Sequence, residues 1–566
     1  MDPKTTNPKT FDDILGNIGE MGLYQIIALA MIVYAILPEA MNSMIYVFAG
    51  AKQDHWCAVD QWSVPQSECL ELRSSDPGGY RDCVFKYKDA SIPRIYTDEE
   101  PSYSQCSKYD IPYPNEWSDQ FYAGDLTNST VSCDDGWAYD HGQYISTIVS
   151  DFDLVCDYKH LAGTTQTIFY AGYLVGSWLS GSISDVIGRY YTFFLSVAID
   201  FVAGMALSFA PSFWYFCLFR FIVGVANISL YLTSFVIVTE LVGPSKRIVS
   251  GVSVGCAFAA GYMLLALLAY FVRDWRTLQR IASLSLLPIF AFMPFLPESP
   301  RWLMDRKKYD KAEEILKTIA RVNRTEDKLS SLSKDSEQTD EDAPKPTFID
   351  LFRGPRLRMA SLALFCVWFV CSLVYFAISL NTAKLGDDDY FTFFLSGLVE
   401  IPAGLICIPL LQSPLGRRYS MLLIMVLLGL SCLAAVVLSK GVLLTVIAMI
   451  GKFFVSTSYS MVYLFSAEIF PTIVRSIGVG TCSTLARVGS MSAPILLILG
   501  DSWEPLPFLV CGSLSLLVSS LILTLPETRN KALAATLEDA ETFIARKGKP
   551  KENDGQKDRN FDDTVA

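Results

Sequence analysis

Twelve long apolar runs dominate this chain of 566 residues. Each run is about 20 residues long, the length that a helix needs to cross the hydrocarbon core of a bilayer. Lipid offers the backbone no hydrogen-bond partner, so each run is predicted to be a transmembrane helix. The runs begin near Tyr24, Thr164, Tyr190, Ser212, Ser250, Leu278, Met359, Phe391, Tyr419, Val442, Ile477 and Leu506. Because 51% of the residues are hydrophobic and only 18% are charged, we expect an all-α membrane protein.

Short charged motifs occur twice in the chain, at one nearly constant separation. Gly188-Arg189 recurs as Gly416-Arg417, and Pro297-Glu298 recurs as Pro526-Glu527. In the same register, Glu240 and Arg247 recur as Glu468 and Arg475. Each motif follows a long apolar run. We therefore predict two copies of a six-helix bundle in parallel order.

The basic residues near the helix ends predict the topology, because Lys and Arg favour the cytoplasmic side. They lie in the even-numbered connections and in the C-terminal tail, which predicts that both termini are cytoplasmic. The net charge of −12 does not oppose this prediction, since much of the acid lies in the first loop and the tail. The predicted parts are a cytoplasmic N-terminus (1–23), a first bundle (24–296), a cytoplasmic linker (297–357), a second bundle (358–526) and a cytoplasmic tail (527–566).

Within the linker, helical spacing of small and apolar residues predicts an amphipathic helix. Those residues are Ala312, Ile315, Leu316, Ile319 and Ala320. The stretch 330–346, which is rich in Ser, Asp and Glu, is predicted to be a flexible connection.

The first loop, 50–160, differs from the rest of the chain because it is polar and rich in cysteine. Its cysteines are Cys57, Cys69, Cys83, Cys106, Cys133 and Cys156. They predict a disulfide-bonded extracellular domain, although 15 pairings are open and a metal site is the alternative. The absence of C-x-x-C spacing favours disulfides. The loop also carries a sequon at Asn128, which is predicted to be glycosylated.

Charged residues inside the apolar runs indicate where a substrate binds. Each costs at least about 2.5 kcal/mol at mid-membrane and is rarely kept without a use. They are Glu39, Arg220, Glu400, Lys452 and Arg487. Gly397 and Gly404 leave space for an amine beside Glu400. Arg487 shares a polar face with Gly480, Ser483 and Ser490, and its fork-shaped cation suits a carboxylate. The alternative is that these charges pair with one another or with a third residue.

Aromatic rings and paired charges complete the candidate machinery. Trp368 and Tyr375 share one helix face and present rings that hold cations well. Opposite charges at helix ends, Glu240 with Arg247 and Glu468 with Arg475, predict a latch that opens and closes as the bundles rock. Alternatively, these charges only fix the topology. Lys452 is either a structural partner for an acid or a second anion contact.

The chain resembles a known family over nearly its whole length. Gly181–Arg189 and Arg220–Gly224 resemble loop and helix motifs of the major facilitator superfamily. The cysteine loop, Ser146–Ser150, Pro297–Leu303 and Ala467–Arg475 resemble the organic cation, carnitine and organic anion transporter family. The tail pattern Leu525–Lys531 is similar to that of insect organic cation transporter proteins.

The resemblance implies roles for further residues, and it also shows where this chain differs from the family's motif. It implies gating roles for Asp185, Arg189 and Arg417, and substrate contacts for Tyr231 and Phe453. Family members with an arginine at the position of Arg487 carry carnitine or anions, whereas an acid at the position of Glu400 is found in cation and carnitine carriers. Val186, Tyr190 and Ser413 depart from the loop motif, so the latch of the first half is predicted to be the stronger one.

Other classes of function are excluded by missing motifs. The chain has no P-loop for ATP, and its three histidines, all in the first loop, offer little for acid–base catalysis. We therefore predict no enzyme, cofactor, metal or nucleic-acid partner.

The predicted function is a plasma-membrane carrier of small organic cations or amine-containing, carnitine-like zwitterions that works by alternating access. The alternatives are an organic anion exchanger using Arg487 and Lys452 and a sugar-type porter. A coupling ion, sodium or proton, and the oligomeric state are left open.

Overall fold

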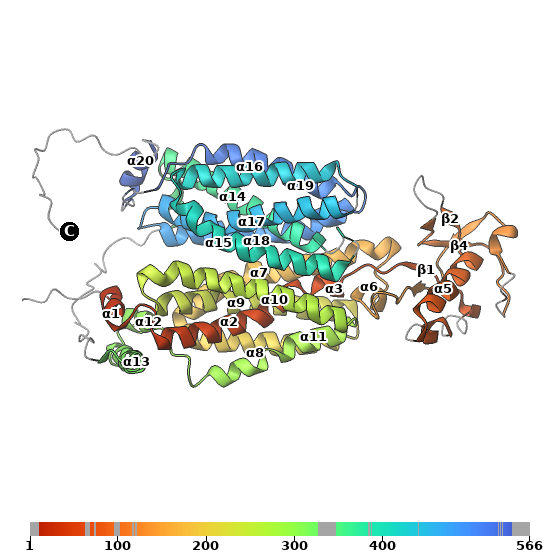
Figure 1. Cartoon of the computed structure of the whole chain (residues 1–566), viewed down its shortest axis with the longest axis horizontal. Coiled ribbons are helices and arrows are strands. Elements are labelled where there is room, and N and C mark those ends of the chain that lie inside the picture. Colours follow the sequence, from red (N-terminus) through yellow and green to blue (C-terminus); the bar gives the residue numbers. More distant parts are fainter. Residues whose placement is uncertain are drawn as a thin grey trace, which may run out of the picture.

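The computed structural model of the protein describes residues 11–62, 68–72, 75–95, 102–115, 118, 121–326, 347–382, 385–386, 388–439, 441–529, 531, 534 and 536–545. Two bundles of helices lie side by side, with a small cysteine-rich domain at one end (Figure 1). The helices α13 and α20 lie at the opposite end, which we call the linker end. The predicted flexible stretch 330–346 lies outside the described residues.

The chain crosses the bundles twelve times, as predicted. The first bundle contains α2 (Leu23–Met44) with α3 (Tyr46–Ala49), α7 (Lys159–Ile187), α8 (Arg189–Ser208), α9 (Phe213–Leu241), α10 (Arg247–Phe271) and α11 (Trp275–Leu284) with η5 (Leu287–Phe292). The second contains α14 (Pro355–Asn381), α15 (Asp389–Gln412), α16 (Gly416–Val436), α17 (Val442–Ile469), α18 (Arg475–Gly500) and α19 (Leu506–Ile522). Judged by length and composition alone, nine helices among the described residues could cross a membrane.

The sixth pass differs from the single continuous helix that its apolar run predicts. It begins at Trp275, where the side chain of Asp274 accepts a hydrogen bond from the Thr277 backbone, and α11 ends after 10 residues. A six-residue 3-10 helix with a proline in its first turn follows. Proline lacks the N–H that an α-helix needs, so the break lies where the sequence places Pro288.

Glycines allow close contact between helices inside each bundle. A Cβ on Gly172 of α7 would overlap the carbonyl oxygen of Phe221 in α9. In the second bundle, a Cβ on Gly489 of α18 would overlap the carbonyl oxygen of Phe369 in α14. Small residues at such crossings bring backbones together, which supplies packing energy that lipid cannot provide.

The two bundles meet through α7 with α18 and through α10 with α15. Among the described residues, four of the polar contacts between the first bundle or its loop and the second bundle lie on the half nearer the cysteine-rich domain. They are Lys52 Nζ–Asp501 Oδ1 (2.6 Å), Tyr144 Oη–Asp389 Oδ2 (2.7 Å), Tyr262 Oη–Ser396 Oγ (3.2 Å) and Tyr390 Oη–Gln143 O (3.3 Å). The bundles are therefore closed together at the end that carries this domain.

Glycines of the four interface helices differ between the two ends. Near the cysteine-rich domain, a Cβ on Gly163 would overlap Ile498, and one on Gly397 would overlap Tyr262. On the linker half, a Cβ at each interface glycine Gly181, Gly255, Gly404 and Gly480 would have no atom within 4 Å. The interface is thus tight at one end and open at these four positions toward the other.

All six cysteines of the first loop form disulfides. The pairs are Cys57–Cys133, Cys69–Cys83 and Cys106–Cys156. His55 lies near Cys106 and Cys156, but both sulfurs are committed to their disulfide, which removes the metal alternative for this group. Folding in three dimensions thus selects one of the pairings that spacing alone left open.

The cysteine-rich domain is built from short elements around a small aromatic core. Its helices are η1 (Asp60–Trp62), α5 (Pro77–Ser91), η2 (Ala123–Asp125), α6 (Ile148–Asp151) and η3 (Cys156–Tyr158). Its antiparallel pairs are β1 (His55–Cys57) with β6 (Trp137–Tyr139), β2 (Arg94–Ile95) with β3 (Ser102–Tyr103), and β4 (Ser107–Tyr109) with β5 (Thr130–Ser132). Trp62 is fully buried against Tyr87, Tyr113 and Phe121. Asn128 is exposed in the turn before β5.

At the linker end, short helices cover the start of each bundle. The remaining helices are α1 (Phe11–Ile18), η4 (Pro244–Lys246), α12 (Pro300–Asp305), α13 (Tyr309–Val322), η7 (Phe348–Phe352) and α20 (Leu537–Ala545). The predicted amphipathic helix is α13, which buries Ala312, Leu316, Ile319 and Ala320. Asn323, just after α13, accepts a hydrogen bond from the Tyr24 backbone at the start of α2. Glu541 of α20 does the same for Arg356 and Leu357 at the start of α14.

Candidate functional site

A buried ion pair lies between α15 and α17 in the second bundle. The Lys452 ammonium is 2.7 Å from Glu400 Oε1, and the two side chains are 0% and 9% exposed. Lys452 also donates to the Ser379 hydroxyl, and the Tyr375 hydroxyl donates to Glu400 at 2.8 Å. Glu400 therefore pairs with a third residue, which was the structural alternative for it. Its charge is neutralised inside the protein.

The space beside Glu400 is partly filled. Gly397 admits the ring of Tyr262 and the side chain of Met263 from α10, so it serves close contact between bundles instead of leaving room for an amine. Gly404, one turn beyond Glu400 toward the linker end, faces open space.

Aromatic rings surround this pair. The Lys452 ammonium lies 3.6 Å from the centre of the Tyr375 ring. Tyr375 approaches Tyr459 at 5.6 Å, and Trp368 approaches Tyr463 at 4.3 Å between ring centres. The Trp368 indole donates to Ser466 at 2.8 Å. The two rings predicted from α14 thus belong to one cluster with Tyr459 and Tyr463 of α17.

Tyr459 and Tyr463 were missed by sequence reasoning. With Lys452 they are spaced at positions i, i+7 and i+11 of α17, so all three lie on one helix face. Tyrosines that share a helix face with a charged residue inside an apolar run could therefore have been predicted from the sequence as members of the site.

Arg487 of α18 is a buried cation of a different kind. Its residue is 4% exposed, its Nε has no hydrogen-bond partner, and among the described residues no carboxylate oxygen lies within 4.0 Å of it. The guanidinium carbon lies 5.9 Å from the centre of the Tyr173 ring in the first bundle. It is buried, and Tyr459, Tyr463, Tyr173 and Tyr231 lie near enough to interact with it electrostatically. Arg487 is thus a buried positive charge at the bundle interface, facing Tyr173 of the first bundle.

Tyr231 and Phe453, the two substrate contacts implied by the family resemblance, have different surroundings. Tyr231 of α9 is half-buried, its ring contacts that of Phe258 at 6.3 Å between centres, and it lies near enough to Glu39, Tyr459 and Arg487 to interact with them electrostatically. The ring of Phe453 contacts that of its neighbour Phe454, at 5.6 Å between centres. The described ring contacts therefore do not bring Phe453 into the aromatic cluster.

The repeated motif forms the same cap at the linker end of both bundles. Glu298 Oε1 accepts from the backbone N–H of Arg189 (2.8 Å) and of Tyr190 (3.2 Å) at the start of α8. Glu527 accepts from Arg417 (2.9 Å) and Arg418 (3.1 Å) at the start of α16. A carboxylate at a helix N-terminus satisfies free N–H groups and complements the helix dipole. Burial raises the pKa of the Glu298 carboxyl, while these backbone donors act in the opposite direction.

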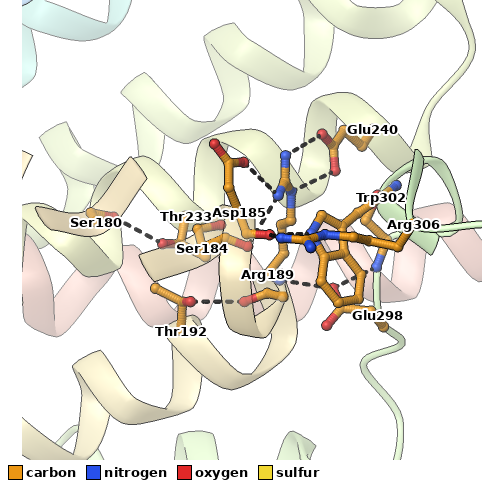
Figure 2. A network of polar contacts seen from close by, with 12 residues as sticks. Ser180, Ser184, Asp185, Arg189, Thr192, Thr233, Glu240, Glu298, Trp302 and Arg306 are labelled. Atoms are coloured by element: carbon orange, nitrogen blue, oxygen red, sulfur yellow. Dashed lines mark hydrogen bonds and ion pairs between the residues drawn. The ribbon is translucent and has the colours of Figure 1, made fainter. Parts of the chain in front are cut away.

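The charged side chains of the motif are also paired within each bundle. Figure 2 shows Arg189 between Asp185 and Glu240, with Nη1–Oδ1 at 2.9 Å and Nε–Oε2 at 3.3 Å. The indole of Trp302 in α12 donates to the Asp185 carbonyl at 3.0 Å. In the second bundle, Arg417 pairs with Glu468, whose carboxylate also accepts from Thr528. Arg247 donates to the Thr239 carbonyl, and Arg475 donates to Phe470 and Thr472.

The cap requires glycine before each helix. Gly188 has φ of 107° and ψ of 163°, a region that essentially only glycine adopts, and a Cβ there would overlap Glu298. We expect Gly188→Ala to cost about 1–3 kcal/mol in strain and to displace the carboxylate. Thermal unfolding of purified protein in detergent measures this loss.

The matched control is Gly181→Ala, in the same motif and in α7. A Cβ there meets no atom within 4 Å, and alanine in a helix is about 0.5–1 kcal/mol better than glycine. If the two variants melt at the same temperature, Gly188 is not required for the cap.

Comparisons with known proteins agree with this architecture. Residues 114–536 match the family model described as "Sugar (and other) transporter". An "Organic cation transporter protein" of Drosophila melanogaster is 34% identical over 557 residues, which cover 96% of both chains. A "Beta-alanine transporter" of the same organism is 33% identical over 94% of this chain and 89% of its own.

Among solved structures, the chain is similar in fold to the proton:xylose symporter XylE of the major facilitator superfamily, from E. coli. The TM-score is 0.53 at 14% sequence identity, over 91% of this chain and 99% of that one. At that identity the likeness concerns the fold alone, which is the twelve-helix arrangement of two bundles.

Proposed function

This chain belongs to the organic cation, carnitine and organic anion transporter family of the major facilitator superfamily, and we propose that it carries small zwitterions with an amine and a carboxylate. It is a multi-span membrane carrier of organic ions and not an enzyme. The proposal concerns which ions it carries, how the bundles move and where the carrier resides.

The observation that carries the proposal is the contrast between the two buried cations. Lys452 is neutralised by Glu400, whereas Arg487 has no carboxylate within 4.0 Å among the described residues. A buried guanidinium without a partner is costly, and a substrate carboxylate would pair with it in two parallel hydrogen bonds. The site therefore favours a substrate that brings a negative charge.

The amine of the same substrate has an aromatic surface to meet. Tyr459, Tyr463 and Trp368 belong to one cluster beside Arg487, whereas the ring of Tyr375 is already occupied by the Lys452 ammonium. A cation over such a ring gains about 0.5–2 kcal/mol, depending on how far it is desolvated. Carboxylate on Arg487 and amine on the rings together fit a carnitine-like or amino-acid-like zwitterion. The similarity to a beta-alanine transporter supports the same class.

The two alternatives predicted from sequence are weaker. An anion exchanger that uses Lys452 as a second anion contact would first have to break its 2.7 Å pair with Glu400. A sugar-type porter would have no use for the unpaired charge of Arg487, because a sugar is neutral.

We propose that access to this site alternates. The bundles are joined near the cysteine-rich domain, and open space lies beside the linker-half glycines of the interface helices. This arrangement corresponds to a carrier that is closed on the outside and faces the cytoplasm. The pairs Arg189–Glu240 and Arg417–Glu468 lie within one bundle each, so they stiffen the linker ends, which then move as units.

The experiment is uptake of three labelled probes into cells that express the chain: carnitine, tetraethylammonium and succinate. They represent a zwitterion, a simple cation and a dicarboxylate. We expect carnitine uptake above that of vector-only cells and little succinate uptake. Uptake of succinate alone would contradict the proposal.

We further propose a plasma-membrane location with the cysteine-rich domain outside and both termini inside. Asn128 is exposed on this domain, so its sequon is accessible to glycosylation. We expect Asn128→Gln to remove the shift in gel mobility that N-glycosidase produces, and Thr130→Ser, which retains a sequon, to preserve it. An unchanged shift in Asn128→Gln would place the glycan elsewhere.

A further inference from the structure

Two carboxylic acids lie inside the first bundle without an ion-pair partner. Glu39 of α2 is 1% exposed, and Asp200 of α8 is 0% exposed. Glu39 Oε2 and both Asp200 oxygens lack a hydrogen-bond partner, and no Lys or Arg nitrogen of the described residues lies within 4.0 Å of either carboxylate. An ionised carboxylate in such surroundings is strongly disfavoured, and a buried acid without a partner takes up a proton instead.

Arg220, the cation that influences Asp200, does not form an ion pair with either acid. Arg220 of α9 donates from Nη1 to the Asn42 carbonyl at 3.1 Å and from Nη2 to Gln166 Oε1 at 3.0 Å, and it lies 4.1 Å from the ring centre of Phe169. It is thus held by neutral groups. With both acids ionised, Glu39, Asp200 and Arg220 carry one net negative charge, which either one proton or the charge of Arg487 across the interface can balance.

We propose that Glu39 and Asp200 hold one proton between them and that the carrier moves this proton together with its substrate. The two acids repel one another electrostatically, so that a single proton relieves the repulsion. The site is distinct from the aromatic cluster and lies in the opposite bundle.

Tyr173 of α7 links the proton to the substrate. Its hydroxyl lies 3.5 Å from Glu39 Oε1 and 3.0 Å from Ser43 Oγ, and its ring faces Arg487 at 5.9 Å. A charged Glu39 attracts Arg487 across the bundle interface and competes with a substrate carboxylate. A protonated Glu39 releases Arg487 for the substrate. By linkage, a substrate carboxylate on Arg487 favours the proton equally. This step rests on the proposed role of Arg487.

The other titratable groups around the two acids are few. Glu39 is influenced by Asp200, Tyr173 and Arg487, and its charge in turn influences Tyr231 of α9. Asp200 is influenced by Arg220. On α11, which packs against α2 and α8, Arg276 pairs with Asp151 and Arg280 lies over Phe209. The span of α10 beyond Arg247 contributes Cys256, Tyr262 and Tyr270 and no charged residue.

The first test is carnitine uptake into proteoliposomes at several external pH values, with a pH dye inside. We expect the apparent KM to rise by up to about tenfold per pH unit at alkaline pH, because only the protonated carrier binds well. Uptake should acidify the lumen. Glu39→Gln should make the KM independent of pH and abolish the acidification, whereas Glu39→Asp should retain both.

Asp200→Asn separates the two acids, because removal of the neighbouring charge should shift the pH profile toward lower pH without flattening it. Glu314→Gln, an exposed acid of α13, is the control and should behave as wild type. A wild-type pH dependence in Glu39→Gln, or uptake that requires sodium in place of choline at constant pH, would overturn the proposal.

The second test needs no transported substrate. Infrared spectra of the purified protein should contain a carbonyl band of a protonated carboxylic acid that titrates with pH, is weakened in Glu39→Gln and is unchanged in Glu314→Gln. If carnitine is not carried but this band is present, the zwitterion proposal fails and the proton site stands. If the band is absent, the proton site fails whatever the substrate.

Discussion

Arg487→Asp is expected to abolish carnitine uptake while preserving, or raising, uptake of tetraethylammonium. The guanidinium is buried, has no carboxylate partner among the described residues, and lies at the bundle interface beside four tyrosines. Hydrogen bonds to charged groups are worth about 1.5–3 kcal/mol each, so their loss lowers affinity for a carboxylate at least about tenfold. An acid at that position also repels the carboxylate and attracts a cation. The measurement is concentration-dependent uptake of both probes.

Arg487→Lys is the matched control for this change. Lysine keeps the charge but not the planar fork that binds a carboxylate through two hydrogen bonds. We expect the carnitine uptake of Arg487→Lys to lie between that of wild type and that of Arg487→Asp. The ratio of carnitine uptake to tetraethylammonium uptake should stay closer to the wild-type ratio. An unchanged substrate profile in Arg487→Asp, with normal surface expression, would remove Arg487 from the substrate site.

Glu400→Gln is expected to destabilise the protein by about 3–5 kcal/mol, because it leaves the Lys452 ammonium buried without its counter-charge. The lysine side chain is fully buried and its hydrogen-bonded partners are Glu400 and Ser379. Thermal unfolding in detergent, together with the yield of monodisperse protein, measures the effect. The loss concerns stability and is separate from any loss of uptake.

The double variant Glu400→Gln/Lys452→Met tests the cause. Replacing both members of a buried ion pair by neutral groups is often neutral for stability, whereas removal of one member is not. We expect the double variant to melt near wild type. If it melts as low as Glu400→Gln alone, Glu400 stabilises the fold through the Tyr375 hydroxyl and not through Lys452.

The architecture was predictable because membranes restrict the chain so strongly. Apolar runs that start near Tyr24, Tyr190 and Tyr419 become α2, α8 and α16 within a few residues of the expected positions. The sixth pass was the exception, since Pro288 breaks a run that remains apolar on both sides. Hydropathy registers length and composition, whereas a helix also needs a continuous set of backbone N–H groups.

The candidate site was predictable in its members but not in their pairing. Sequence identified Glu400, Lys452 and Arg487 as costly charges, because burial inside an apolar run is a local property. Which of them neutralise one another depends on how α15, α17 and α18 are placed. Glu400 and Lys452 are 52 positions apart, yet they form one ion pair, and the same packing leaves Arg487 without a carboxylate.

By itself, the sequence determined the helical class, the duplication, the residues of the repeated motif and the cysteines that form disulfides. These features follow from local composition and spacing. The tertiary structure alone decided the disulfide pairing, the closure of the bundles at one end, the neutralisation of Lys452 and the lack of an ion-pair partner for Glu39, Asp200 and Arg487 among the described residues. Each of these depends on distances between segments far apart in the chain, and the energy of interaction between buried charges depends on such distances.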